Sequence, residues 1–529
     1  MPGDEERAAR PGNGTHPVSF AFVLAAALAS AAGPSDAVTA AANDLLAQPI
    51  EVRPYLRYLS LYHLEGKGNE RWLADWKTVT DFHVNTLSRR QRLQPAVRVT
   101  ASLLRVNIKD YGWDPKVWER LAQIEPYFHA TLLVEKVTDE QRYHPGGEVN
   151  GTYYAPGNYT FRERTKVKKR SAAHWLPTQA AATLAKWCET ETPIVRADWF
   201  FYQTSIAKDR VAGYYDWLGL GKNAKDFQKL LGGDEDVARA VGREIRGIRG
   251  KSGVTLSNRV IVRYGAATGG WWVTYDYKDN DRGRNVIRNL DKDVNPPDGD
   301  ASEQLGFLPN GLFAWWLQDA NGVRQDTAPD FIASDNAATG NDKRVHCAMS
   351  CYRCHVEGIR PVGDYARRLY RGKVKLAAVD YEKYVRLVDL YLTDLKRWVD
   401  QDTDQYSRSV WELTRMKPGE LMRVYGRCWD HYLERDLDAG AVAEELGTTP
   451  AHLMLVLRTY ATPGKGIPPL DPVLAQLIAE DDDGNPEPIP LRREHLEEAY
   501  VNLQDVLLGY RGPPAGKTPP PPKRNEKKE

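Results

Sequence analysis

Apolar residues in the middle of the chain fall in short runs that are rich in Val, Trp and Tyr. Three such runs, at 258–264, 270–277 and 311–318, have the length and composition of strands. The last run leads into Asp319-Ala320-Asn321-Gly322, and the Asn-Gly pair is typical of a hairpin turn. The pattern therefore predicts a β-rich central region with a hairpin turn after its last run.

On either side of this region the apolar residues are spaced as in helices or alternate over short stretches. Residues 97–108 alternate and predict a strand, whereas Asp114-Pro115 predicts a helix start with a capping carboxylate. Asp400, Asp402 and Asp404 predict a solvated acidic turn rather than a calcium loop, because Gln405 and Trp411 replace the required glycine and glutamate. Helical periodicity predicts helices at 171–188, 226–248, 379–399, 413–437, 439–446 and 450–460.

Composition indicates an ordinary globular protein with an aromatic core. The chain has 529 residues, of which 42% are hydrophobic and 27% charged. Its 72 basic and 71 acidic residues leave a net charge of +1, so no overall field favours nucleic acid or an anionic membrane. The 15 Trp and 27 Tyr predict extensive aromatic packing inside the fold.

One stretch carries clear chemistry. Cys351-Tyr352-Arg353-Cys354-His355 reads C-x-x-C-H, the spacing by which haem c is attached to protein. Two thiols three residues apart can each form a thioether to one haem vinyl group, and the histidine can ligate the iron. With 5 Cys and 11 His in the chain, chance would give this pattern in roughly one such chain per thousand. We therefore expect one covalently attached haem c, held by Cys351 and Cys354, with His355 as the iron ligand.

Cys347 leaves two other readings of this stretch open. Cys347, Cys351 and Cys354 also have the C-x3-C-x2-C spacing of radical S-adenosylmethionine enzymes, which bind an iron–sulfur cluster. These three cysteines and a histidine could alternatively hold a structural zinc ion. The iron–sulfur reading is the weaker of the two, because its cysteines normally lie early in a barrel of βα units.

The N-terminus has the features of an export signal. Residues 18–32 are an uncharged apolar run, and Ala29-Ser30-Ala31 resembles a cleavage site. Arg7 and Arg10 precede the run, but nearby acidic residues offset the positive charge that is usual at the start of an export signal. The run itself is too short to favour a membrane-spanning anchor. Haem c is attached outside the cytoplasm, so the motif and the leader together predict a periplasmic or otherwise exported protein with no integral membrane segment in the mature chain.

Together these patterns predict an α+β fold in which a mixed N-terminal part and a β-rich central part precede a mainly helical haem-c part. Glycine- and proline-rich stretches and changes of periodicity set the boundaries. We expect a leader at 1–33, an α/β region at 34–249, a β-rich region at 250–343, a helical cytochrome-c-like haem region at 344–511 and a disordered tail at 512–529.

The sequence leaves the sixth haem ligand and the remaining cysteines undecided. A methionine ligand raises the reduction potential and a histidine usually lowers it, whereas an open position permits peroxide or oxygen chemistry. In an oxidising compartment two of Cys188, Cys347 and Cys428 could pair as a disulfide. The candidates for the sixth ligand on the C-terminal side are Met416, Met422, Met454, His431 and His452.

Several short segments, in a fixed order over most of residues 50–510, carry a family resemblance. They are Arg57 to Tyr62, Leu104 to Trp113, Arg196 to Phe200, Asn258 to Val260, Trp272 to Asp276, Leu308 to Leu312, Gly322 to Arg324 and Ala328-Pro329. With these segments the chain resembles a family of large bacterial c-type cytochrome proteins, which contain a cytochrome c domain. In that family the haem segment usually reads C-M-S-C-H, and Cys347-Ala348-Met349-Ser350-Cys351 looks like an offset echo of it.

The resemblance implies an exported haem-c protein in which Cys351, Cys354 and His355 are carried over, and it implies no substrate. From motif and resemblance we expect a monohaem cytochrome that exchanges single electrons with a redox partner protein. A haem-based enzyme or gas sensor with an open sixth position remains an alternative, as does a zinc-stabilised binding module.

Overall fold

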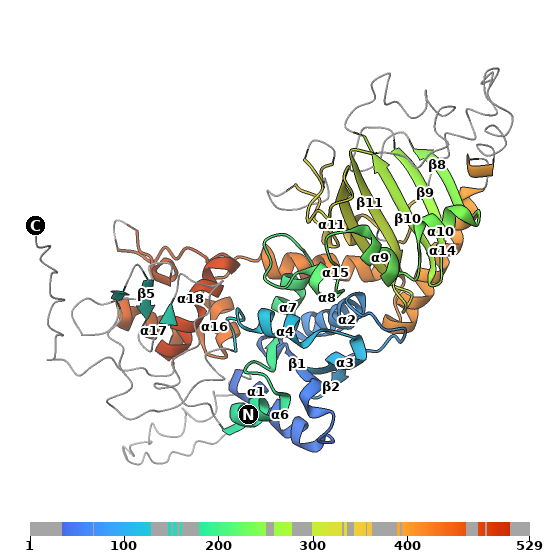
Figure 1. Ribbon diagram of the computed structural model, residues 1–529. Coiled ribbons are helices and arrows are strands. Elements are labelled where there is room, and N and C mark those ends of the chain that lie inside the picture. The colour runs from blue at the N-terminus through green and yellow to red at the C-terminus, as the bar shows by residue number, and fades with distance from the viewer. Residues whose placement is uncertain are drawn as a thin grey trace, which may run out of the picture.

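The chain folds into an α+β protein whose C-terminal region is helical, as the sequence predicts (Figure 1). The predicted leader and the predicted tail lie outside the residues that the structure describes. The computed structural model describes residues 34–66, 68–128, 147–149, 152–155, 159–160, 179–249, 259–277, 299–330, 333–335, 343–355, 357–361, 389–391, 394–461, 474–481 and 484–507.

A four-stranded sheet organises the N-terminal part. Its strand order is β2 (Val97–Arg98), β3 (Leu103–Asn107), β1 (Leu56–Ser60) and β7 (Ile194–Arg196). β1 is antiparallel to β3 and parallel to β7, with Leu59 opposite both Leu104 and Val195. All five residues of β1 are buried, so the middle of this sheet is covered on both faces.

Helices surround this sheet. α4 begins at Pro115, and the Asp114 carboxylate caps it by accepting from Lys116 N at 2.9 Å, as the sequence predicts. A small sheet of β4 (Gly147–Val149), β5 (Thr152–Ala155) and β6 (Tyr159–Thr160) also belongs to this part. The helices are α1 (Pro34–Ala47), α2 (Glu70–Thr86), α3 (Ile108–Tyr111), α4 (Pro115–Ala122), α6 (Gln179–Cys188), α7 (Ala197–Thr204) and α8 (Tyr214–Trp217), with the 3-10 turns η1 (Arg53–Tyr55) and η2 (Tyr62–Leu64). The next two helices, α9 (Ala224–Leu230) and α10 (Glu235–Ala240), pack instead on the central five-stranded sheet.

The central part is a five-stranded antiparallel sheet with the order β12-β11-β10-β9-β8. Three of its strands confirm the predicted runs: β9 (Arg259–Ala266), β10 (Gly269–Asp276) and β12 (Phe313–Asp319). β8 (Glu244–Arg249) and β11 (Ala301–Phe307) complete it. After β12, Gly322 N donates to Asp319 O at 3.0 Å, which forms the predicted turn.

Both faces of this sheet are covered, so its strands are buried almost throughout. Neighbouring residues point to opposite faces: Trp271 approaches Gly233, between α9 and α10, whereas Trp272 faces α14 (Leu395–Thr414). Figure 1 shows α14 running along the sheet opposite α9 and α10. The sheet is therefore the middle layer of three.

A buried ion pair fastens α14 to the sheet. The Asp402 side chain is fully buried and accepts from Arg263 Nε at 2.8 Å and Arg263 Nη2 at 3.0 Å. Trp272 Nε1 also donates to Asp402, at 2.8 Å. The prediction of a solvated acidic turn is therefore wrong for Asp402, because a carboxylate with three partners can be buried inside a helix.

Residues 226–248, predicted as one helical stretch, end in a strand. Gly232 and Gly242, both with positive φ (65° and 67°), end α9 and α10 respectively. The chain then pairs as β8 with β9, placing Ile248 opposite Val260. This part of the prediction is wrong because pairing with a strand distant in sequence overrides the local pattern.

The C-terminal helices confirm most of the predicted helical segments, with shifted ends. α14 spans both the end of the predicted 379–399 helix and the predicted turn. Figure 1 shows α16, α17 and α18 grouped beside the N-terminal part, away from the five-stranded sheet. The remaining elements are α11 (Met349–Cys354), α15 (Pro418–Leu433), α16 (Ala439–Leu446), α17 (Pro450–Ala461), η4 (Leu474–Ile478) and α18 (Arg493–Leu507).

Candidate functional site

The C-x-x-C-H stretch forms a short helix and its end. α11 carries Cys351 and Cys354 one helical turn apart, and His355 follows as the C-cap residue. Figure 1 shows α11 between the five-stranded sheet and α15. Two contacts fix this position: Tyr352 OH donates to Phe313 O of β12 at 2.9 Å, and the Tyr352 ring lies 5.9 Å from that of Tyr425 in α15.

A strained turn introduces this helix. Ala348 has φ 68° and ψ −64°, and Met349 N donates to Cys347 O at 3.0 Å, which is the geometry of a γ-turn with positive φ. Remote contacts hold the turn in place: Cys347 N donates to Asp326 O at 3.1 Å, and His346 N donates to Ser350 Oγ at 3.0 Å. Strain of this kind persists only where the surroundings enforce it, and it is enriched at functional sites.

The His355 ring has a defined orientation. Its Nδ1 lies 3.1 Å from Gly358 O, and its ring centroid lies 4.9 Å from that of Trp315. Because a carbonyl only accepts, Nδ1 carries the proton in this hydrogen bond. The lone pair of the neutral ring is then on Nε2, which is the arrangement of a metal-binding histidine oriented by a backbone carbonyl.

The loop that supplies this carbonyl is anchored on α14. Gly358 has φ 112°, and a Cβ there would lie 2.7 Å from Thr403 Cγ2. The next residue, Ile359, donates from its backbone N to Thr403 Oγ1 at 3.2 Å. Glycine is therefore required at position 358 for both its backbone conformation and its close approach to α14.

The two motif cysteines differ in their surroundings. Cys351 is 1% exposed, and burial together with a hydrogen bond to Cys347 raises the pKa of its thiol. Cys354 is only partly buried, and burial raises its pKa to about 11. Both thiols are thus protonated at neutral pH, which is unlike the lowered pKa of a nucleophilic catalytic cysteine.

Cys347 belongs to the core behind the motif. It is fully buried, and its thiol is hydrogen-bonded to both Cys351 and the Tyr215 hydroxyl. Cys188 lies in α6 and Cys428 in α15, and all five cysteines are free thiols in this structure. No disulfide therefore joins Cys188, Cys347 and Cys428 here.

The motif's donor set fits haem c. Cys351 and Cys354 stand one turn apart, and the hydrogen bond from Nδ1 to Gly358 O orients the His355 ring. The fit has one condition: Cys351 must leave its contact with Cys347 to form a thioether, because a thiol that is 1% exposed cannot meet a porphyrin in the closed fold. Haem attachment would therefore have to precede the final packing of α11.

The zinc reading finds less support in the geometry. Within the described ranges, no group of three or more His, Cys, Asp or Glu side chains converges as a metal-binding set. Cys347 and Cys351 point into the core beside Tyr215, whereas Cys354 and His355 lie partly exposed at the other end of α11. Two of the four candidate ligands are therefore buried and two lie partly exposed.

Among the candidate sixth ligands, the structure brings α15 to the motif. Tyr425 contacts Tyr352, and Met422, which is 6% exposed, lies one turn earlier on the same side of α15. Met416 packs, partly buried, just before that helix. His431 instead stacks on Trp72 at 4.0 Å, and burial lowers its pKa to about 4. Met454 and the exposed His452 lie on α17 among the C-terminal helices.

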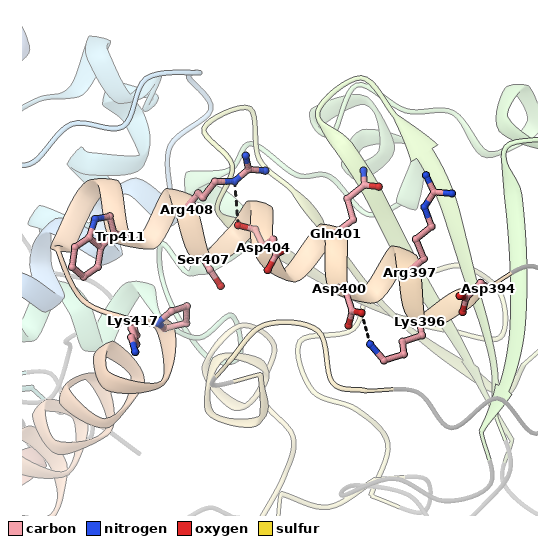
Figure 2. A pocket seen from close by; sticks show the side chains of 11 residues that line it. Asp394, Lys396, Arg397, Asp400, Gln401, Asp404, Ser407, Arg408, Trp411 and Lys417 are labelled. Atoms are coloured by element: carbon pink, nitrogen blue, oxygen red, sulfur yellow. Dashed lines mark hydrogen bonds and ion pairs between the residues drawn. The ribbon is translucent and has the colours of Figure 1, made fainter.

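A charged groove runs along the outer face of α14 (Figure 2). Its volume is about 1050 Å³. A Cβ at Gly419, next to the groove, would lie 3.2 Å from Glu357 Oε1, so the groove passes beside the loop that follows the motif. Its lining residues are Asp394, Lys396, Arg397, Asp400, Gln401, Asp404, Ser407, Arg408, Trp411, Lys417 and Pro418.

Sequence reasoning missed a network of buried charges between the N-terminal sheet and the C-terminal helices. Arg196 pairs with Asp198 and, at 2.7 Å, with Glu445 of α16. Glu445 also accepts from Arg493 of α18 at 2.6 Å, and Asp198 accepts from His63 at 3.0 Å. The one part of this network that the sequence analysis names is Arg196-Ala197-Asp198, which belongs to a segment that carries the family resemblance. The charges balance, so the network acts as a structural lock.

Comparisons with known proteins add no relative: no family model, no curated protein and no solved structure matches the chain. The residues that the structure describes contain no helix that is long and apolar enough to cross a membrane. The site must therefore be interpreted from its own geometry.

Proposed function

We propose that the chain is an exported monohaem c-type cytochrome that exchanges single electrons with a partner protein. Cys351 and Cys354 hold the porphyrin, and His355 ligates the iron through Nε2. The haem supplies the redox centre when it is bound, and the chain tunes its potential by burial and hydrogen bonding.

The hydrogen bond from His355 Nδ1 to Gly358 O is the observation that carries this proposal. A C-x-x-C-H sequence alone would leave the histidine free to turn either nitrogen outward. Here the backbone of the following loop selects the Nδ1–H tautomer, and the Trp315 ring limits how the imidazole can turn. Both features prepare the ring to bind a metal through Nε2.

The remaining residues of the site have roles in positioning. Tyr352 ties α11 to β12 through Phe313 O, and Thr403 holds the loop that carries Gly358. Cys354 and His355 are only partly buried, so this end of α11 reaches the surface. A surface-accessible centre suits electron exchange with a docked protein, which requires no substrate cavity.

Covalent attachment is the first test of the proposal. The full chain is produced with a periplasmic haem-maturation system, and a denaturing gel is stained for haem. The wild-type band should stain, and a reduced-minus-oxidised spectrum should show the bands of haem c. An unstained band, with the protein folded and present in the periplasm, overturns the proposal.

Cysteine variants identify the attachment pair. Cys351→Ala with Cys354→Ala should abolish the stain, whereas Cys347→Ala should keep it. Cys428→Ala is the matched control, because Cys428 is as deeply buried as Cys347 but lies outside the motif. Loss of the stain in Cys347→Ala, with retention in Cys428→Ala, would show that Cys347 belongs to the attachment pair.

A second candidate function is a haem enzyme or gas sensor with an open sixth position. The observation that favours it is the groove of about 1050 Å³ beside the loop after the motif, which is large enough for a small ligand. Carbon monoxide separates the two functions. An immediate spectral shift of the reduced protein supports an open position, and an unchanged spectrum supports a ligand such as Met422 and hence electron transfer.

A further inference from the structure

An unbroken series of aromatic rings leads away from the motif. His355 lies 4.9 Å from Trp315, which lies 5.5 Å from Tyr352. Tyr352 lies 5.9 Å from Tyr425, and Tyr425 lies 4.8 Å from Phe201, all measured between ring centroids. Every ring after His355 is at most 5% exposed, so this first part of the series runs through the core.

The series continues through α7 and α15 to the opposite side of this core. Phe201 lies 5.7 Å from Trp429, and Trp429 lies 5.4 Å from Tyr202. Tyr202 is only partly buried and lies 5.3 Å from Tyr432, which is 1% exposed. The rings thus connect the motif to one partly exposed tyrosine and one deeply buried tyrosine.

The two ends of the series differ in how they can handle a proton. The Trp315 indole N–H is buried and has no hydrogen-bond acceptor among the described residues, so an oxidised Trp315 keeps its proton and remains a strong oxidant. Tyr432 OH, in contrast, donates to the Glu497 carboxylate. A phenol that loses an electron becomes very acidic, and a carboxylate at hydrogen-bond distance can take its proton at once.

We propose that the rings from Trp315 to Tyr432 form a relay for electron holes, in which Glu497 is the proton acceptor at the far end. Reduction of a peroxide at the motif would take two electrons, one from the haem centre and one that leaves Tyr432 and passes along the rings. The phenolic proton of Tyr432 moves to Glu497 Oε1, which leaves a neutral tyrosyl radical. An external one-electron donor at Tyr202 then restores Tyr432, and the proton returns from Glu497.

This relay rests on the second candidate function, the haem enzyme with an open sixth position, because a peroxide must reach the centre at the motif. Its test uses the protein without haem, so the two proposals can fail separately. Cys354 is the one cysteine that is not fully buried, and a ruthenium tris-bipyridine maleimide can be attached to it at alkaline pH. Flash photolysis with an oxidative quencher then creates a hole beside Trp315, and transient absorption and electron paramagnetic resonance identify the radicals.

The expected result is a tryptophan radical that decays into a tyrosyl radical. Tyr432→Phe should remove most of the tyrosyl signal, and Glu497→Gln should slow its formation while the tryptophan radical persists. Tyr111→Phe is the matched control: Tyr111 is also a buried tyrosine, stacked on Trp113, but it lies outside the relay. The control should leave yield and rate unchanged.

Interrupting the middle of the series provides the decisive comparison. Tyr425→Leu should confine the radical to Trp315 and Tyr352, and Tyr425→Phe, which preserves the packing, should slow the transfer. A tyrosyl signal that survives Tyr432→Phe, or that forms at the wild-type rate in both Tyr425 variants, overturns the relay. If the ruthenium-labelled chain transfers holes but the unlabelled chain, produced with the haem-maturation system, carries no haem, the relay stands and the cytochrome proposal fails.

Discussion

Replacing Gly358 by alanine tests whether the loop after the motif is built as the structure indicates. The Gly358 carbonyl orients His355, and its backbone has φ 112°, which a residue with a Cβ rarely adopts. An added Cβ would also lie 2.7 Å from Thr403 Cγ2, well inside van der Waals contact. We therefore expect Gly358→Ala to move this loop away from α14 and from His355.

The size of the effect follows from two contributions. Holding a non-glycine residue in this backbone region costs about 1–3 kcal/mol. Crowding against a packed methyl group costs about another 1–3 kcal/mol. Together they should lower the free energy of unfolding by about 2–6 kcal/mol, measured on the haem-free chain by urea unfolding with tryptophan fluorescence.

A double mutant separates the two contributions. Thr403→Ser removes Cγ2 but keeps the hydroxyl that accepts from Ile359 N. Added to Gly358→Ala, it should recover the crowding part, with a coupling energy of about 1 kcal/mol or more. In the haem-loaded protein, Gly358→Ala should raise the reduction potential, because losing the Nδ1 hydrogen bond makes His355 a weaker donor to the iron. The reasoning is refuted if Gly358→Ala lowers the free energy of unfolding by less than about 0.5 kcal/mol, or if adding Thr403→Ser restores none of the lost free energy.

Three further predictions concern stability. Asp402→Ala should cost about 3–5 kcal/mol in urea unfolding because it leaves Arg263 buried and unpaired, whereas Asp404→Ala, on the exposed side of α14, should cost less than about 0.5 kcal/mol. Burial raises the pKa of Glu125 to about 8 from 4.5, so its contribution to the free energy of unfolding is most favourable below pH 4.5 and falls by up to about 5 kcal/mol towards pH 8. Glu125→Gln should flatten this part of the plot of stability against pH, and an unchanged plot contradicts the assignment. Two buried guanidinium groups hold the pKa of Glu445 well below 4.5, so its stabilisation is present above pH 4.5 and is lost as the pH falls; Glu445→Gln should weaken the fold most at neutral pH, as thermal unfolding at several pH values can show.

The sequence predicts the elements whose pattern is local. The runs that became β9, β10 and β12 consist of β-branched and aromatic residues, and an Asn-Gly turn follows the last of them. Asp114-Pro115 predicts the start of α4, because capping depends on residues that are neighbours in the chain. The C-x-x-C-H spacing is local in the same sense, so the candidate donors could be named without coordinates.

Features that depend on distant partners were mispredicted or missed. Asp402 has the surroundings of a solvated turn in sequence, and its burial depends on Arg263 and Trp272, which lie far upstream. β8 pairs with β9 although its own segment continues a helical pattern. The lock of buried charges joins His63 to Arg493, and no window of sequence contains both. In each case a long-range contact overrides the local preference.

The candidate site unites both kinds of information. Its donors are consecutive in sequence, but their geometry depends on a chain of contacts that starts in the β-sheet. Arg263 holds Asp402, and the neighbouring Thr403 holds the loop through Ile359 N, which places the Gly358 carbonyl against His355. A substitution at Asp402 that loosens α14 should therefore also alter the orientation of His355, because Thr403, Ile359 and Gly358 link the two residues indirectly. The five-stranded sheet therefore belongs to the proposed haem site, since it sets the orientation of His355 through α14.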